Sequence, residues 1–305
     1  MSDKTVPLID MDWDAFDPWR IQPFNHRLTE HPLLQTQELV ELGKRCRGTK
    51  LWYAFNSDVT AGTDFDDASN LFPTSKSAVD SLRDIGSAKA WVLLRHIQAD
   101  PRYRTLVDEV INPMQPMIER KDPGLYYRAG WIFSASPNTA TPFHIDRSHV
   151  FLFQIRGTKT VYVWDANDRV VCSDRARDCF HLRHDLSRTL WKEEFRRRAH
   201  VFRLSPGTGV YMPLTSPHMV ETSQESSTTI SFTYNTDATR RNGRVHVMRE
   251  MLAKLGISPP DVGVNTLFDR AAYAAGSAIV VCHGPGGHPP ACPSLLRKSD
   301  YAVAD

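Results

Sequence analysis

Short runs of β-branched and aromatic residues fill the second half of the chain, and they restrict the fold more than any other feature. They begin after the turn signal at residues 121–124. The runs lie at 125–134, 149–155, 158–164, 200–204, 209–213, 218–222 and 228–234. So many short strands in so short a stretch indicate an antiparallel sandwich or barrel. We therefore predict a mainly β fold with helical additions.

Helical patterns flank and interrupt these runs. Apolar spacing predicts helices at 31–46, 77–85 and 101–119, with strands at 51–55 and 90–97 between them. Residues 185–199 are expected to form a helical insertion between strands, and helices return after residue 237. The predicted division is an N-terminal arm (1–30), a main domain (31–236), C-terminal helices (237–280) and a Gly/Pro-rich tail (281–305). The aromatics of the arm either dock on the domain or belong to a loosely ordered tail.

The charge balance gives no indication of a nucleic-acid or membrane partner. The formal net charge is +2, and the basic run at 196–198 is balanced by Glu193 and Glu194. The longest apolar stretch, 271–282, is interrupted and too short to cross a bilayer. The acidic start lacks the features of a secretory signal, and five irregularly spaced cysteines fit reduced thiols. A cytoplasmic location is therefore expected.

One pattern carries specific chemistry. His144 and Asp146 are two residues apart, so on a strand their side chains point to the same face and can bind one metal ion. His218 begins a later strand run, which in a small barrel can lie beside the first. Two imidazoles and one carboxylate form the facial triad that leaves adjacent positions open on Fe(II). The alternative is that each histidine simply satisfies hydrogen bonds at a strand end.

The residues around this pattern are similar to a known family. Thr141, Pro142, His144 and Asp146 are followed by an apolar strand and then by a Q-I-x-G-x-K pattern at 154–159. The block resembles the JmjC-type, cupin-fold 2-oxoglutarate oxygenases, especially the asparaginyl-hydroxylase subgroup. The distal family pattern is matched by Gly207, Gly209, Tyr211, Pro213 and His218, although its Asp is missing. The resemblance covers roughly residues 125–235 and implies a double-stranded β-helix, or jelly-roll, core.

The resemblance also implies a cosubstrate site for 2-oxoglutarate. Lys159 would bind its distal carboxylate, Thr141 would add a hydrogen bond, and Ser231 is the nearest candidate for a supporting polar group. Alternation in the strand places Lys159 on one face with Val161 and Val163, which favours an inward ammonium over a solvated one. A carboxylate brought into a barrel needs such a charge to offset its desolvation.

The implied reaction is hydroxylation of an unactivated C–H bond, with Fe(II), O2 and 2-oxoglutarate, which becomes succinate. The expected substrate is a side chain of a protein or peptide, or an amino-acid-derived small molecule. Four residues are candidates for contact with the substrate. The alternative for each is that it holds the metal-binding residues in position. They are Trp131, Asn138, Arg147 and His149.

Other readings stay open at this point. The triad also fits a Zn- or Mn-binding cupin that acts as an isomerase or binding protein. A second alternative is a JmjC-like interaction module that has the fold but no catalytic activity. Cys282, His283, His288 and Cys292 are four zinc-ligand types in a short window, though not at finger spacing. The C-terminal helices would either pair two subunits or pack on the barrel.

Overall fold

The computed structural model describes residues 7–47 and 49–282. Eight strands in the second half of the chain form the barrel, and all seven predicted strand runs are found among them. The eight are β5 (Tyr126–Ala135), β6 (Ala140–His144), β7 (His149–Arg156), β8 (Lys159–Val163), β9 (His200–Leu204), β10 (Thr208–Met212), β11 (His218–Thr222) and β12 (Ser227–Asn235).

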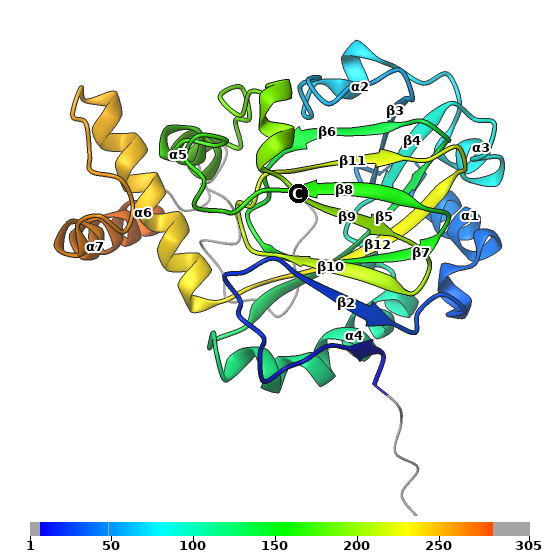
Figure 1. Cartoon of the computed structure of the whole chain (residues 1–305), viewed down its shortest axis with the longest axis horizontal. Coiled ribbons are helices and arrows are strands. Elements are labelled where there is room, and N and C mark those ends of the chain that lie inside the picture. The colour runs from blue at the N-terminus through cyan, green and yellow to red at the C-terminus, as the bar shows by residue number, and fades with distance from the viewer. Residues whose placement is uncertain (1–6, 48, 283–305) are drawn as a thin grey trace, which may run out of the picture.

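These strands divide between two facing antiparallel sheets (Figure 1). The larger sheet contains the order β10-β7-β12-β5, and the smaller sheet has the order β6-β11-β8-β9. Successive strands thus alternate between the sheets, except that β8 and β9 are neighbours in the smaller sheet, and this is the order of a double-stranded β-helix. The mainly β, jelly-roll prediction is confirmed. Apolar side chains from both sheets fill the interior, among them Leu152, Val161, Val163 and Val210.

The larger sheet is extended at both edges by the first third of the chain. β1 (Ile9–Asp10) and β2 (Gln22–His26) continue it beyond β10, and β4 (Ala90–Leu94) and β3 (Trp52–Asn56) continue it beyond β5. The arm therefore docks, with the ring of Phe24 packed over Gly209, where an added Cβ would lie 2.3 Å from that ring. Glycine at 209 is required by this close approach.

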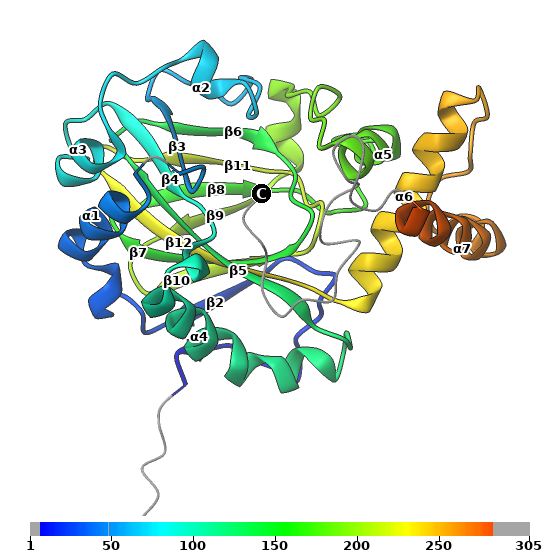
Figure 2. The same cartoon turned by 180° about the vertical axis from the view of Figure 1, so that it is seen from behind.

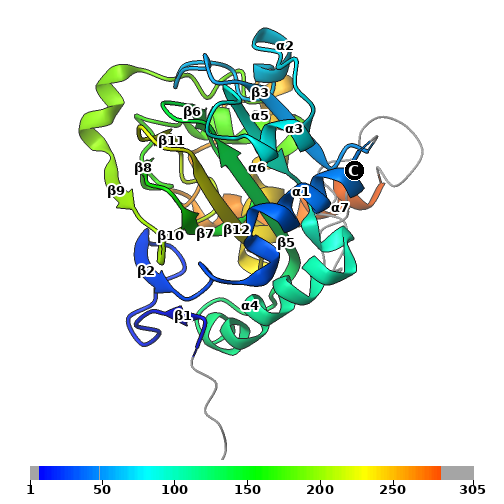
Figure 3. The ribbon, with the colours of Figure 1, turned by 90° about the vertical axis from the view of Figure 1, so that its right-hand side faces the viewer.

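Helices cover the outer face of the larger sheet and one end of the barrel (Figures 2 and 3). Toward the sheet lie α1 (Thr36–Arg45), α3 (Ala78–Arg83) and α4 (Pro101–Glu119), with short helices η1 (Pro32–Leu34), α2 (Ala68–Leu71) and η2 (Ile97–Ala99). At the end of the barrel α5 (Asp174–Arg183) packs against α6 (Asp237–Lys254), which packs against α7 (Thr266–Cys282). The helices predicted at 31–46, 77–85, 101–119 and after 237 are confirmed.

The helical insertion was predicted at the wrong place. Residues 185–199 contain only the 3-10 turn η3 (Glu193–Arg198), while the regular helix of this region is α5, where the Ser173 hydroxyl accepts a hydrogen bond from Ala176 N–H. Trp191 and Phe195 instead cover Phe143 and Trp164 on the outer face of the smaller sheet. Tertiary packing of these large rings overrides the helical spacing.

Two predictions remain untested by the structure. His283, His288 and Cys292 of the Cys/His window, and the rest of the tail beyond Cys282, lie outside the described residues. The boundaries between arm, main domain and C-terminal helices stay predictions. For the described part of the chain, none of the helices has the length and apolar character that crossing a bilayer requires.

Candidate metal centre

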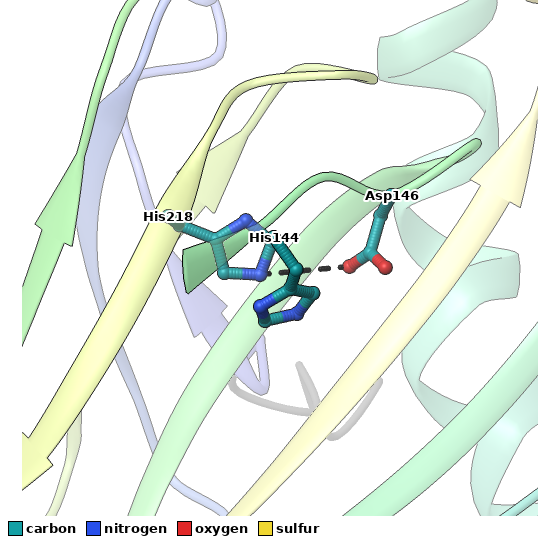
Figure 4. Close-up of side chains that lie close together, drawn as sticks. All are labelled: His144, Asp146 and His218. Carbon is teal, nitrogen blue, oxygen red and sulfur yellow. Dashed lines mark ion pairs between the residues drawn. The ribbon is translucent and has the colours of Figure 1, made fainter. Parts of the chain in front are cut away.

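His144, Asp146 and His218 meet at one end of the barrel, which we call the ligand end (Figure 4). His144 is the last residue of β6, His218 is the first of β11, and these strands pair with His144 opposite His218. Asp146 follows in the turn to β7. One candidate ligand atom from each residue lies within 4.8 Å of the others. Hydrogen bonding between β6 and β11 thus joins residues that are far apart in sequence.

Backbone carbonyls fix the orientation of both imidazoles. Nδ1 of His144 lies 2.7 Å from the carbonyl oxygen of Pro142, and Nδ1 of His218 lies 3.0 Å from that of Ser216. A carbonyl oxygen only accepts hydrogen bonds, so each Nδ1 carries the proton and each Nε2 keeps a lone pair. This tautomer is the one a histidine adopts when Nε2 binds a metal.

Burial favours the neutral form of the His144 imidazole. Burial and then the neighbouring His218 lower the pKa of His144 to about 4, although Asp146 and the Pro142 carbonyl act in the opposite direction. The Nε2 atom of His218 lies 3.6 Å from a carboxylate oxygen of Asp146. Phe65 stacks on the other face of the His144 ring, with centroids 4.3 Å apart. The donor set therefore fits a divalent transition metal such as Fe(II).

A register shift in the smaller sheet brings Thr141 to the same face as His144. On β11, His218 pairs with His144, but Val220 pairs with Thr141, so β6 carries one extra residue between the pairs. Without this bulge, residues three apart would point to opposite faces. On the other side of β11, Thr222 pairs with Lys159. Thr141 and Lys159 thus share the inner face with the candidate ligands.

Lys159 is buried in the barrel, as the strand alternation predicted, with 7% of its surface exposed. Burial lowers the pKa of its ammonium to about 7. No ion pair of Lys159 is found among the residues that the structure describes. A buried amine without an acid partner fits the binding of an anion from outside the protein.

Thr141 has one partner already. The indole N–H of Trp91, on β4, donates a hydrogen bond of 2.9 Å to the Thr141 hydroxyl oxygen. Trp91 is itself held by stacking on Phe55, with centroids 4.5 Å apart. Since the hydroxyl oxygen accepts from Trp91, its own proton remains free to be donated elsewhere.

The remaining predicted residues divide into three inside the site region and two outside it. Ser231 pairs with Trp131 and with Leu152, an interior residue, so Ser231 and Trp131 face the barrel interior. Arg147 lies beside Asp146 and donates hydrogen bonds to the carbonyl oxygens of Phe180 and His181 at the end of α5.

Asn138 and His149 lie away from the ligand face, and their expected substrate role stays a prediction. Asn138 is in the turn before β6, six residues from His144, which corresponds to roughly 20 Å along a strand. His149 is fully buried beneath the N-terminal arm, where its Nδ1 lies 2.8 Å from the Tyr211 hydroxyl. Strand direction separates Asn138 from His144, and strand parity places His149 on the opposite face of β7 from the interior residue Leu152.

Several residues near the centre had no sequence signal. Phe65 lies in a polar, turn-rich stretch, and Trp91 lies in a strand that looks like ordinary core. Asp66 also lies near the centre. Burial and repulsion by Asp64 raise the pKa of its carboxyl group to about 6, while Arg147 and Arg95 act in the opposite direction. Only the pairing of β3 and β4 with β5 brings these residues to the ligand end.

Comparison with known proteins agrees with the fold. A family model described as JmjC domain matches residues 125–241, which confirms the resemblance drawn from the motifs; the asparaginyl-hydroxylase subgroup stays a prediction. No curated protein matches the sequence.

Solved structures resemble this chain only distantly. YcfD from Escherichia coli is 14% identical, with a TM-score of 0.46, over 90% of this chain and 69% of YcfD. YcfD in complex with cobalt and 2-oxoglutarate is also 14% identical, with a TM-score of 0.45, over 89% of this chain and 66% of that one. The DMSP lyase DddQ from Ruegeria pomeroyi DSS-3, 14% identical, gives 0.24 over 36% of this chain and 39% of that chain. This chain thus spans about two thirds of YcfD, and likenesses of this size identify no function for it.

Proposed function

We propose that this chain, which matches the JmjC domain over residues 125–241, is a 2-oxoglutarate-dependent oxygenase that holds Fe(II) with His144, Asp146 and His218. One observation carries the proposal. Two imidazoles with free Nε2 lone pairs and one carboxylate converge at the ligand end, on the barrel face that also buries Lys159. A metal-binding site alone would not require an unpaired lysine in the barrel.

When bound, Fe(II) would supply the activation of O2, with 2-oxoglutarate decarboxylated to succinate and CO2; one oxygen atom would enter succinate and the other the oxidised C–H bond of the substrate. Lys159 would pair with the distal carboxylate of 2-oxoglutarate, and Thr141 would donate its hydroxyl proton to the same group. Ser231, on the facing sheet, would support them. The valines of the interior would keep water from the reacting groups.

The chain's own residues set the position of each part. Carbonyls of Pro142 and Ser216 hold the imidazoles, and the β6 bulge brings Thr141 to the inner face. We propose hydroxylation of a side chain in a protein or peptide, or of an amino-acid-derived molecule. The cytoplasmic location inferred from sequence stays a prediction.

The test is the visible charge-transfer band that forms when 2-oxoglutarate chelates Fe(II) in the absence of O2. We expect the band in the wild type, its loss in His144→Ala, and a much higher 2-oxoglutarate requirement in Lys159→Ala. His200→Ala is the matched control, because His200 is an exposed histidine on β9 outside the centre. After O2 is admitted, wild type should form succinate.

The competing hypothesis predicts a different set of results. A Zn- or Mn-binding cupin would bind its metal through the same three residues, yet it would show no band and form no succinate. Lys159→Ala would then leave metal binding and any activity unchanged. That combination would exclude the oxygenase.

A further inference from the structure

An arginine without an acid partner lies at the ligand end. Arg95 follows β4 directly, and β4 pairs with β5 so that Leu94 is opposite Ile132. The next pair in this register sets Arg95 opposite Trp131. The Arg95 guanidinium lies over the Trp131 ring, 5.6 Å from its centroid. Arg95 is half-buried, and within the described residues its side chain makes no hydrogen bond or ion pair.

Trp131 itself has an unused donor. Its ring is packed against His96, with centroids 4.5 Å apart, and its indole N–H is buried without a hydrogen-bond partner among the described residues. A buried donor left unpaired is costly, so such groups usually have a partner. Arg95 and Trp131 therefore present two N–H donor groups next to each other with nothing in the described protein to accept from them.

A second guanidinium increases the positive charge of this region. Arg147 adjoins Asp146, and its Nε is buried and unpartnered within the described residues. Both Arg95 and Arg147 act electrostatically on Asp66 and on His184, and His184 is also within range of Asp146. These groups consequently border one shared region at the ligand end.

The acids of this region make no ion pair with Arg95 or Arg147 among the described residues. Asp146 would be neutralised by the metal that it binds. Asp64 accepts hydrogen bonds from the backbone N–H groups of Asp66 and Asp67. Asp185 makes an ion pair with Arg183 and accepts a hydrogen bond from the backbone N–H of Ser187. Asp66 is the carboxylate that both guanidinium groups influence, yet neither Arg95 nor Arg147 makes an ion pair with an acid among the described residues.

We propose that the substrate of this oxygenase carries a carboxylate, which binds Arg95 and the indole N–H of Trp131 beside the metal centre. A guanidinium is suited to this role because its planar donors match a carboxylate in a two-point contact. Contact with the Trp131 ring restricts the movement of the guanidinium before the substrate arrives. The inference rests on the proposed function, since it names the substrate class of the same site.

The experiment uses the full chain loaded with Mn(II) and excess 2-oxoglutarate, which fills the cosubstrate position and prevents turnover. Broadening of probe proton signals by Mn(II) then reports binding near the metal. Two matched probe pairs distinguish the source of the carboxylate. N-acetylglutamate α-amide against N-acetylglutamine amide tests a side-chain carboxylate, and N-acetylalanine against its amide tests a terminal one.

We expect at least one carboxylate probe to bind about tenfold or more tightly than its amide partner, as charged hydrogen bonds allow. Arg95→Gln should remove this preference, Arg95→Lys should retain part of it, and Trp131→Phe should weaken it while the aromatic surface remains. Arg83→Gln is the control, because Arg83 is an exposed arginine on α3.

Equal binding of both members in both pairs would overturn the proposal, as would a preference that survives in Arg95→Gln. Stronger binding of N-acetyllysine amide than of any carboxylate probe would also overturn it. Binding of 2-oxoglutarate to the same Mn(II) sample keeps the two proposals separate. If 2-oxoglutarate binds but no carboxylate preference exists, only the substrate inference fails; if 2-oxoglutarate does not bind, the oxygenase itself fails.

Discussion

At the scale of single residues, Lys159 links cosubstrate binding to pH. Its pKa of about 7 in the cosubstrate-free barrel means that the ammonium loses its proton near neutrality. Because 2-oxoglutarate needs the charged form, its affinity should fall as the pH rises above about 7, with proton uptake on binding. Titrations of the Mn(II) protein between pH 6 and 9 would measure this. Lys159→Met should bind weakly at every pH; an equally steep decline in that variant would contradict the assignment.

The same group affects the stability of the cosubstrate-free protein. Its folded pKa is depressed below the ordinary lysine value, so the unfolded chain binds more protons between about pH 7 and the ordinary value of 10.5. The Lys159 contribution is therefore most destabilising below pH 7, and stability rises with pH through that window. Lys159→Met should increase the free energy of unfolding more at pH 6 than at pH 9.

Trp91 is expected to act through Thr141 as a positioning residue. Trp91→Phe keeps the ring on Phe55 but removes the N–H that fixes the Thr141 hydroxyl. Loss of one neutral hydrogen bond predicts a rise of about 3- to 10-fold in the 2-oxoglutarate dissociation constant. Trp52→Phe, on the neighbouring strand β3, is the matched control. Unchanged cosubstrate affinity in Trp91→Phe would show that the contact is only structural.

The site residues that could be predicted from the sequence are those that local spacing along a strand identifies. His144 and Asp146 lie two apart on a strand, and Lys159 alternates with valines. Phe65, Trp91 and Arg95 reach the ligand end only through the pairing of β3 and β4 with β5, which no local pattern encodes. Asn138 is near His144 in sequence but lies before β6, at the other end of that strand from His144.

At the scale of elements, α5 and α6 are joined through a buried carboxylate. Asp178 is fully buried and accepts hydrogen bonds from Nδ1 of His246 at 2.7 Å and from Nε of Arg249 at 3.0 Å. Asp178→Ala would leave Arg249 buried without this partner. We expect a loss of about 3–5 kcal/mol in the free energy of unfolding.

Urea unfolding measures this loss directly. Glu194→Ala, at an exposed position on η3, should change the free energy of unfolding by less than about 0.5 kcal/mol. Since the end of α5 also accepts hydrogen bonds from Arg147, Asp178→Ala should in addition raise the mobility of that arginine. A stability equal to that of the control variant would show that α5 is held by apolar contacts alone.

The elements themselves were largely predictable, because alternation and helical spacing are local signals. The strands of the barrel follow from β-branched and aromatic runs, and α1, α3 and α4 follow from apolar spacing. Which strands pair was not predictable from these patterns; the jelly-roll order came from the family resemblance. The helix predicted at 185–199 was wrong because Trp191 and Phe195 pack on the smaller sheet instead.

At the scale of the whole molecule, the C-terminal helices leave apolar side chains exposed. Leu255, Ile257, Val264 and Leu267 are between 50% and 77% exposed around the connection of α6 and α7. The homodimer stays a prediction, and these residues are where it would be tested. Sedimentation equilibrium should give twice the chain mass, and Leu255→Glu with Leu267→Glu should give a monomer. A wild-type monomer over the accessible concentration range would contradict the dimer.

The ligands arise from strands separated by 72 residues, between Asp146 and His218. During translation at about 5–20 residues per second, His218 is added roughly 4–14 seconds after Asp146. Through that interval His144 and Asp146 are present in the nascent chain but the third candidate ligand is not. The complete set exists only after β11 has paired with β6. Full metal affinity is therefore a property of the finished barrel, and metal capture would follow folding in time.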